Sequence, residues 1–156
     1  QGTRVDFARN TLVVIVPVSA PQTPADLKAL GGAGYQRIAT GSPSTVPVGR
    51  YTMDAVQLAG VAGVLEPRWI YGESVRQVLN YVARGEVDAG FVYRTDALIE
   101  PGKIRIAFTA PTPTAVSYPV AVVTASKNAT TGNSFIAFVR ASEGRQILER
   151  FGFSQP

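Results

Sequence analysis

Histidine and cysteine are both absent from the 156 residues of this sequence. Their absence excludes Ser-His-Asp and Cys-His nucleophile systems, histidine general bases and the usual zinc sites. Any chemistry of this chain must therefore rely on carboxylates, lysine, tyrosine, serine or threonine. With 46% hydrophobic and 17% charged residues, the composition is that of an ordinary soluble globular chain with one core or two small lobes.

Long hydrophobic runs and clusters of positive charge are also missing. The longest apolar runs, such as Leu12–Val18, fall far short of the roughly 20 residues that a transmembrane helix requires. The net charge is +4, and the basic residues are spread along the chain without runs, so we do not expect nucleic acid as a partner. The sequence begins at Gln1 without methionine or a signal peptide, which predicts a processed or truncated start and leaves export open.

Apolar and β-branched runs alternate along the chain with helical patterns, which predicts an α/β fold. Most of these runs are continuous, as strands of a buried sheet require. The predicted strands are 11–16, 37–40, 89–93, 104–108 and 118–124. The predicted helices are 23–30, 48–58, one capped by Ser74 that carries Val75–Val82, one that begins at Asn133 or Ser134, and one capped by Ser142 that ends at Arg150.

Two apolar segments, 11–18 and 118–124, bracket the middle of the chain. They predict that residues 15–116 form one complete α/β lobe and that residues 1–14 and 117–156 belong to another. The two C-terminal helices have no sheet of their own left to cover, so their apolar residues must be buried against something else. These residues are Phe135, Ile136, Phe138, Ile147, Leu148, Phe151 and Phe153.

The segment Thr40–Tyr51 is the most informative stretch of the chain. It is poor in charge, rich in glycine and hydroxyl groups, and leads from a predicted strand into a predicted helix. Backbone N–H groups at such a helix start can point at an anion. The segment therefore indicates binding of an anion and not catalysis.

Five ordered segments resemble one family along essentially the whole chain. They are Asn10–Pro17, Ala39–Pro43 with Val46–Tyr51, Gly72–Arg76, Gly85–Tyr93 and Tyr118–Val122, followed by the closing Phe151–Phe153. In order and spacing they resemble the periplasmic molybdate-binding proteins of bacterial ABC importers. The resemblance implies a type II clamshell of the periplasmic-binding-protein kind, built from two small α/β lobes with the anion held in the cleft between them. It also implies a periplasmic location, a membrane permease as partner, no cofactor and no enzymatic activity.

The resemblance assigns three contacts to the oxyanion in this chain. They are the backbone N–H groups of Val48 and Val75 and the hydroxyl of Tyr93, as contacts to molybdate or tungstate oxygens and not as direct metal ligands. The residues themselves are compatible with these roles: Val48 and Val75 begin predicted helices, where N–H groups lack intrahelical partners, and Tyr93 ends a predicted strand. Neutral donors suit an oxyanion that is fully deprotonated, whereas monoprotonated phosphate would bring a donor of its own.

The chain departs from the family at its beginning. The segment that would build most of the first lobe, with two further serine contacts, does not occur in it. We therefore expect one intact second lobe plus the hinge strands and C-terminal helices of the first. We also expect the 156-residue chain alone to bind the anion weakly or not at all and to self-associate through apolar surface.

Other interpretations stay open from the residues alone. Val48 and Val75 are also typical core residues of a helix first turn, and Tyr93 could be a packed tyrosine. The same fold serves as the effector-binding domain of cytoplasmic transcription regulators. A carboxylate-dependent enzyme would need clustered acids, but Glu86 and Asp88 lie on a predicted polar turn where solvated charge is the usual finding. Trp69, Tyr71 and Tyr81 could line a sugar site, although packing and surface roles are more typical of them.

Overall fold

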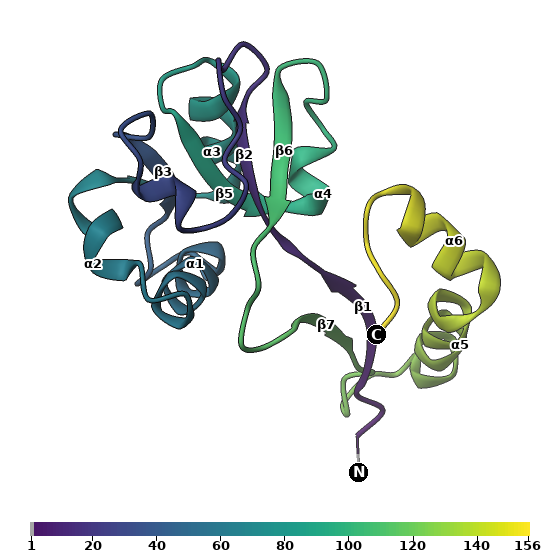
Figure 1. Ribbon diagram of the computed structural model, residues 1–156. Coiled ribbons are helices and arrows are strands. Elements are labelled where there is room, and N and C mark those ends of the chain that lie inside the picture. Colours follow the sequence, from purple (N-terminus) through teal and green to yellow (C-terminus); the bar gives the residue numbers. More distant parts are fainter. Residues whose placement is uncertain (1) are drawn as a thin grey trace. The chain divides into compact units, whose positions relative to one another are not determined.

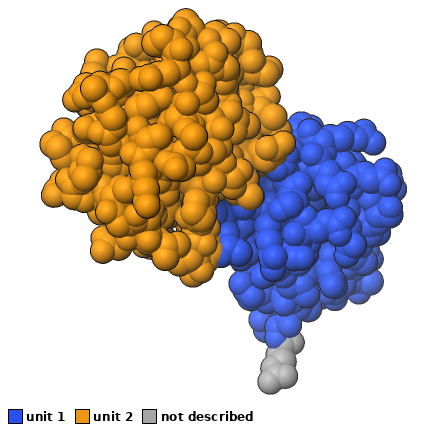
Figure 2. Space-filling view, in the orientation of Figure 1, with its two compact units in different colours: residues 1–10, 115–156 blue, residues 11–114 orange. Residues whose placement is uncertain are grey.

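The computed structural model describes residues 2–156 and divides into two compact units. One unit is Thr11–Thr114, and the other combines residues 2–10 with Ala115–Pro156 (Figure 2). The boundaries fall at 10/11 and 114/115, a few residues before the sequence-based ones at 14/15 and 116/117. The sequence-based boundary would divide the strand Leu12–Pro17 after residue 14, whereas in the structure the whole strand belongs to the larger unit. The assignment of the two units to lobes of a clamshell stays a prediction.

The larger unit is built on a five-stranded mixed sheet with the order β4-β3-β5-β2-β6 (Figure 1). Strands β4, β3 and β5 are parallel to one another, while β2 runs antiparallel to both of its neighbours, β5 and β6. The bounds are β2 Leu12–Pro17, β3 Ile38–Gly41, β4 Trp69–Gly72, β5 Ala89–Tyr93 and β6 Ile104–Thr109. The helices are α1 Pro47–Leu58, α2 Ala62–Leu65, α3 Val75–Ala83 and α4 Arg94–Ala97, with short 3₁₀ turns at Ala29–Gly31 and Glu66–Arg68.

Strand β2 lies inside this sheet with its side chains buried on both faces. Its side chains alternate between two hydrophobic clusters: Leu12, Val14 and Val16 belong to one, and Val13 and Ile15 to the other. Helix α1 contributes to the first cluster and helix α3 to the second. A strand that is apolar at every position is what a sheet covered by helices on both faces requires. The continuous apolar pattern therefore predicted the layering correctly.

The smaller unit is a two-stranded antiparallel sheet with two helices. Strand β1 (Val5–Asn10) pairs with β7 (Val116–Val120), and α5 (Ala129–Arg140) and α6 (Ser142–Arg150) follow in sequence. The ring of Phe153 meets that of Tyr118 edge-on at 5.4 Å between centroids. Four large apolar side chains of α5, α6 and the residue that follows α6 stay substantially exposed. They are Phe135 at 59%, Phe138 at 42%, Ile147 at 39% and Phe151 at 66%.

For these four residues the exposure agrees with the expectation that the chain offers the two helices little to cover. The other three residues of the expected set are better covered, since Ile136 is buried at 8% exposure and Leu148 and Phe153 are half-buried. Self-association through the apolar residues of α5 and α6 stays a prediction.

Four predicted elements differ clearly from the structure. Residues 23–30 form no α-helix: Asp26 accepts from the N–H of Ala29, and only a 3₁₀ turn follows. The last strand is Val116–Val120 instead of 118–124, and α5 begins at Ala129, earlier than Asn133. Ser142 is not the cap of α6, because the N-cap is Ala141 and the Ser142 hydroxyl accepts from the Gln146 side chain at 3.1 Å.

Candidate functional site

The three predicted site residues follow the carboxyl ends of three adjacent parallel strands. Gly41, the last residue of β3, is in register with Gly72, the last residue of β4, and β5 runs parallel beside β3. Val48 lies in α1 after β3, Val75 begins α3 after β4, and Tyr93 ends β5. Because parallel strands end at the same edge of a sheet, all three residues lie along one edge, where α/β folds place ligands.

Helix α1 presents its first backbone donor at Val48. The N-cap Val46 makes no side-chain capping bond, and Pro47 at the first helical position has no N–H to donate. The side chain of Val48 is fully buried in the core, as the packing interpretation expected. A chain of buried hydroxyls fixes this turn on the sheet: Thr40 donates to Thr52 at 2.9 Å, and Thr52 donates to the carbonyl of Val48 at 2.8 Å.

Glycines allow the turn between β3 and α1 to be unusually tight. The position that a Cβ of Gly49 would take is occupied by the carbonyl oxygen of Gly41, and the nitrogen of Pro43 lies 2.9 Å away. Ser42 donates its backbone N–H to the carbonyl of Gly72 at 2.9 Å, which ties this turn to the end of β4. The glycine-rich segment thus joins two of the strand ends that carry the candidate site.

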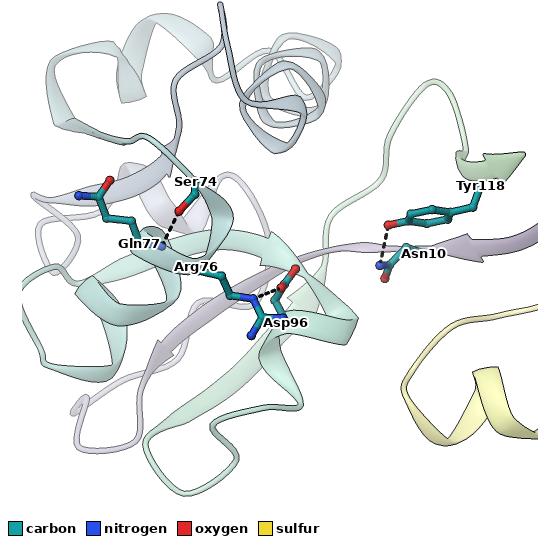
Figure 3. A network of polar contacts seen from close by, with 6 residues as sticks. All are labelled: Asn10, Ser74, Arg76, Gln77, Asp96 and Tyr118. Atoms are coloured by element: carbon teal, nitrogen blue, oxygen red, sulfur yellow. Dashed lines mark hydrogen bonds and ion pairs between the residues drawn. The ribbon is translucent and has the colours of Figure 1, made fainter.

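Helix α3 begins with a reciprocal cap. Ser74 accepts from the N–H of Gln77 at 3.2 Å (Figure 3). The side chain of Gln77 in turn accepts from the N–H of Glu73 at 2.6 Å. This arrangement resembles a capping box. It occupies the N–H groups of Glu73 and Gln77, which lie before and after Val75 in the sequence. Val75 itself is the first helical residue, so its N–H has no intrahelical acceptor. The predicted Ser74 cap is confirmed.

Tyr93 is half-buried and packs against the larger hydrophobic cluster. Its ring meets that of Tyr51 in α1 edge-on, with 6.3 Å between centroids and 75° between planes. Tyr93 is also the N-cap residue of α4. Its aromatic body is therefore held by packing, while the role of its hydroxyl toward an anion stays a prediction. The contact with Tyr51 was not anticipated from the sequence.

An ion pair connects the starts of α3 and α4. Nε of Arg76 lies 3.0 Å from an Asp96 carboxylate oxygen (Figure 3). The Asp96 side chain is only 9% exposed, whereas that of Arg76 is 59% exposed. Burial raises the pKa of the Asp96 carboxyl above its ordinary value of 3.8, and it outweighs the opposing effects of Arg76 and of a hydrogen bond from the Tyr93 backbone.

The raised pKa of Asp96 predicts how stability depends on pH. The folded state binds the Asp96 proton more tightly than the unfolded state, so this contribution to stability is full below about pH 4 and is lost as pH rises through the raised pKa. Asp96→Asn cannot titrate and serves as the reference. We expect the free energy of unfolding of the wild type, relative to Asp96→Asn, to fall in urea titrations as the pH rises above about 4. A relative stability that rises with pH would contradict this assignment.

The carboxylates considered for catalysis have other roles. Asp88 accepts from the backbone N–H groups of Gln36 and Arg37, both at 2.8 Å, and so ties the chain before β3 to the chain before β5. Glu86 lies 3.8 Å from Arg84 at the exposed end of α3. Both acids precede β5 and therefore lie at the edge of the sheet opposite to Tyr93. Their positions do not support a catalytic carboxylate pair.

Among residues 2–156, no group of three or more aspartates or glutamates is placed to hold a metal ion. No helix in this part of the chain is long and apolar enough to cross a membrane. The aromatic residue Trp69 packs against the ring of Phe91, with 5.9 Å between centroids, which supports a packing role over a sugar site.

Known proteins share this sequence and fold over nearly the whole chain. Molybdate-binding protein ModA of Escherichia coli is 33% identical over 160 residues, which cover 98% of this chain and 61% of the relative. YvgL of Bacillus subtilis, a substrate-binding lipoprotein assigned to an ABC transporter, is 32% identical, and the match covers 96% of this chain and 57% of the relative. The chain thus spans about six tenths of the length of these relatives.

A solved structure agrees with these matches. The substrate-binding domain assigned to a molybdenum ABC transporter of Clostridium difficile has a TM-score of 0.88 and 29% identity, with coverage of 99% of this chain and 67% of that one. The fold is therefore the α/β periplasmic-binding-protein fold. The sequence profile described as "Bacterial extracellular solute-binding protein" matches residues 1–154. The chain belongs to this family, whose members bind solutes and are not enzymes.

Proposed function

We propose that the protein binds molybdate through the backbone N–H groups of Val48 and Val75 and the hydroxyl of Tyr93. The observation that carries the proposal is that these three residues lie along one edge of the sheet, after the carboxyl ends of β3, β4 and β5. Two of them lie in the first turns of helices of twelve and nine residues, whose dipoles favour negative charge at that end. The molybdate-binding relative from Escherichia coli and the Clostridium difficile domain support the choice of ligand.

The donors in this set are all uncharged. Molybdate, tungstate and sulfate carry no proton at neutral pH and can accept a hydrogen bond at every oxygen. Monoprotonated phosphate would bring a donor that meets N–H and O–H groups, and such an unmatched buried pair costs roughly 1–3 kcal/mol. Tungstate has the same charge and tetrahedral shape as molybdate, so we propose that it binds as well.

The proposed role is delivery of the anion to an ABC permease from the periplasm. Family membership places the protein among extracellular solute-binding proteins, which supports this role over an effector-binding domain of a cytoplasmic regulator. The match to a substrate-binding lipoprotein assigned to an ABC transporter supports the same partner. The permease, the periplasmic location and delivery itself are parts of the proposal.

Isothermal titration calorimetry with four anions tests the choice of ligand. We expect molybdate and tungstate to bind more tightly than sulfate, and phosphate to bind most weakly at neutral pH, because it alone carries a proton. Each anion is titrated as its sodium salt at the same ionic strength, so that unspecific screening is equal. Binding of sulfate as tight as that of molybdate would refute the assignment.

Tyr93→Phe tests the hydroxyl alone. The ring and its contact with Tyr51 are kept, while one donor to the anion is lost, so we expect molybdate binding to weaken by about 1–3 kcal/mol without loss of the fold. Tyr81→Phe on α3 is the matched control, since this hydroxyl lies two turns from the helix start. An unchanged affinity in Tyr93→Phe would show that Tyr93 has only a packing role.

A further inference from the structure

The ion pair between Arg76 and Asp96 lies directly beside two of the proposed donors. Arg76 is the second residue of α3 and follows Val75, the first. Asp96 is the third residue of α4, and Tyr93 is the N-cap of that helix. The Asp96 carboxylate accepts from Arg76 on one side and from the backbone of Tyr93 on the other. One buried carboxylate thus connects the first turn of α3 to the end of β5.

From this connection we propose that Asp96 and Arg76 are positioning residues of the anion site. They hold the N–H of Val75 and the hydroxyl of Tyr93 at a fixed separation and so act through these donors. The proposal rests on the proposed function of Val75 and Tyr93. It assigns a role to Arg76 and Asp96, two charged residues that are not among the uncharged donors to the anion.

The exposure of the pair argues that its main role is not stability. Arg76 is more than half exposed, and ion pairs with an exposed partner add little to the free energy of folding. The Asp96 carboxylate, in contrast, is buried, and this burial disfavours its charged form and raises its pKa. Donors fixed before the ligand arrives need no reorganisation on binding, and small misplacements of such groups are costly. A buried carboxylate that links two donor-bearing turns would serve this purpose.

The test compares four substitutions by calorimetric titration with sodium molybdate. Asp96→Ala removes both hydrogen bonds, whereas Asp96→Asn keeps one oxygen, which can accept from Arg76 or from the Tyr93 backbone. Arg76→Gln removes the partner on α3. The matched control is Arg84→Gln, which breaks the exposed Arg84–Glu86 pair at the other end of the same helix. Thermal unfolding of every variant verifies that the titrated protein is folded.

We expect Asp96→Ala and Arg76→Gln to bind molybdate about tenfold more weakly, and Asp96→Asn and Arg84→Gln to stay within about threefold of the wild type. If Asp96→Ala does not fold, Arg76→Gln alone decides the question, because its side chain is exposed. Equal affinities in Arg76→Gln, Arg84→Gln and the wild type would overturn the proposal. Failure of the wild type to bind molybdate would instead refute the proposed function.

A double-mutant cycle separates positioning from a general effect on the fold. If Arg76 acts by placing the Tyr93 hydroxyl, its substitution should cost less in a Tyr93→Phe background than in the wild type. A merely structural role would lower the affinity by the same factor in both backgrounds. Equal factors would therefore contradict this part of the proposal.

Discussion

Gly49→Ala is expected to destabilise the Thr11–Thr114 unit by roughly 3 kcal/mol and to abolish molybdate binding. A Cβ at this position would overlap the carbonyl oxygen of Gly41 and crowd the nitrogen of Pro43. Both are backbone atoms, which cannot rotate away as a side chain could. The substitution must therefore push α1 away from the end of β3, and the N–H of Val48 moves with the helix.

Urea unfolding followed by circular dichroism measures the loss of stability. Gly63→Ala is the control, since nothing lies within 4 Å of the Cβ that would be added on α2. Because alanine is the better helix former, we expect this control to change stability by at most about 1 kcal/mol, in the stabilising direction. A Gly49→Ala protein as stable as the wild type would show that the turn between β3 and α1 is not as tight as described.

Arg68→Ala is expected to cost roughly 3 kcal/mol as well, by releasing the segment before β3. The guanidinium of Arg68 donates to four backbone carbonyls, at distances from 2.6 to 3.0 Å. The acceptors are Leu30, Gly31, Gly32 and Tyr35. Lysine cannot replace this fork of donors, so Arg68→Lys should recover only part of the loss.

Amide hydrogen exchange locates the effect of Arg68. We expect faster exchange at Gly31, Gly32 and Tyr35, whose N–H groups bond within the same turn, while the amides of β2 stay protected. Arg37→Ala removes an equal charge from an exposed side chain and is the control. Unchanged exchange at the three turn amides in Arg68→Ala would contradict the proposed role of the guanidinium.

The sequence predicted elements well where local pattern and burial agree. The bounds of β5 were predicted as observed, and α3 was recognised from its apolar spacing and its Ser74 cap. Residues 23–30 carry an equally plausible helix signal, with Thr23 and Pro24 at its start. The carbonyl of its last residue, Leu30, is bonded by Arg68, which lies 38 residues further along the chain. No local pattern encodes such a long-range contact.

The candidate site was predictable only in part. The helix-start positions of Val48 and Val75 follow from local signals, but their choice as contacts came from the family resemblance. That three strand ends share one edge depends on the parallel pairing of β4, β3 and β5. The Arg76–Asp96 pair joins residues from different helices, and its burial became visible only in the folded chain.

The most direct test of the account is an NMR titration of the chain with sodium molybdate, read from the backbone amide signals. Chemical shifts report weak binding as well as tight binding, so the test does not depend on the affinity. We predict saturable shifts that are largest for the N–H groups of Val48 and Val75, with smaller changes at the amides of Asp88 and Arg37 on the opposite edge of the sheet. Shifts that leave Val48 and Val75 unmoved while other amides respond would contradict the account.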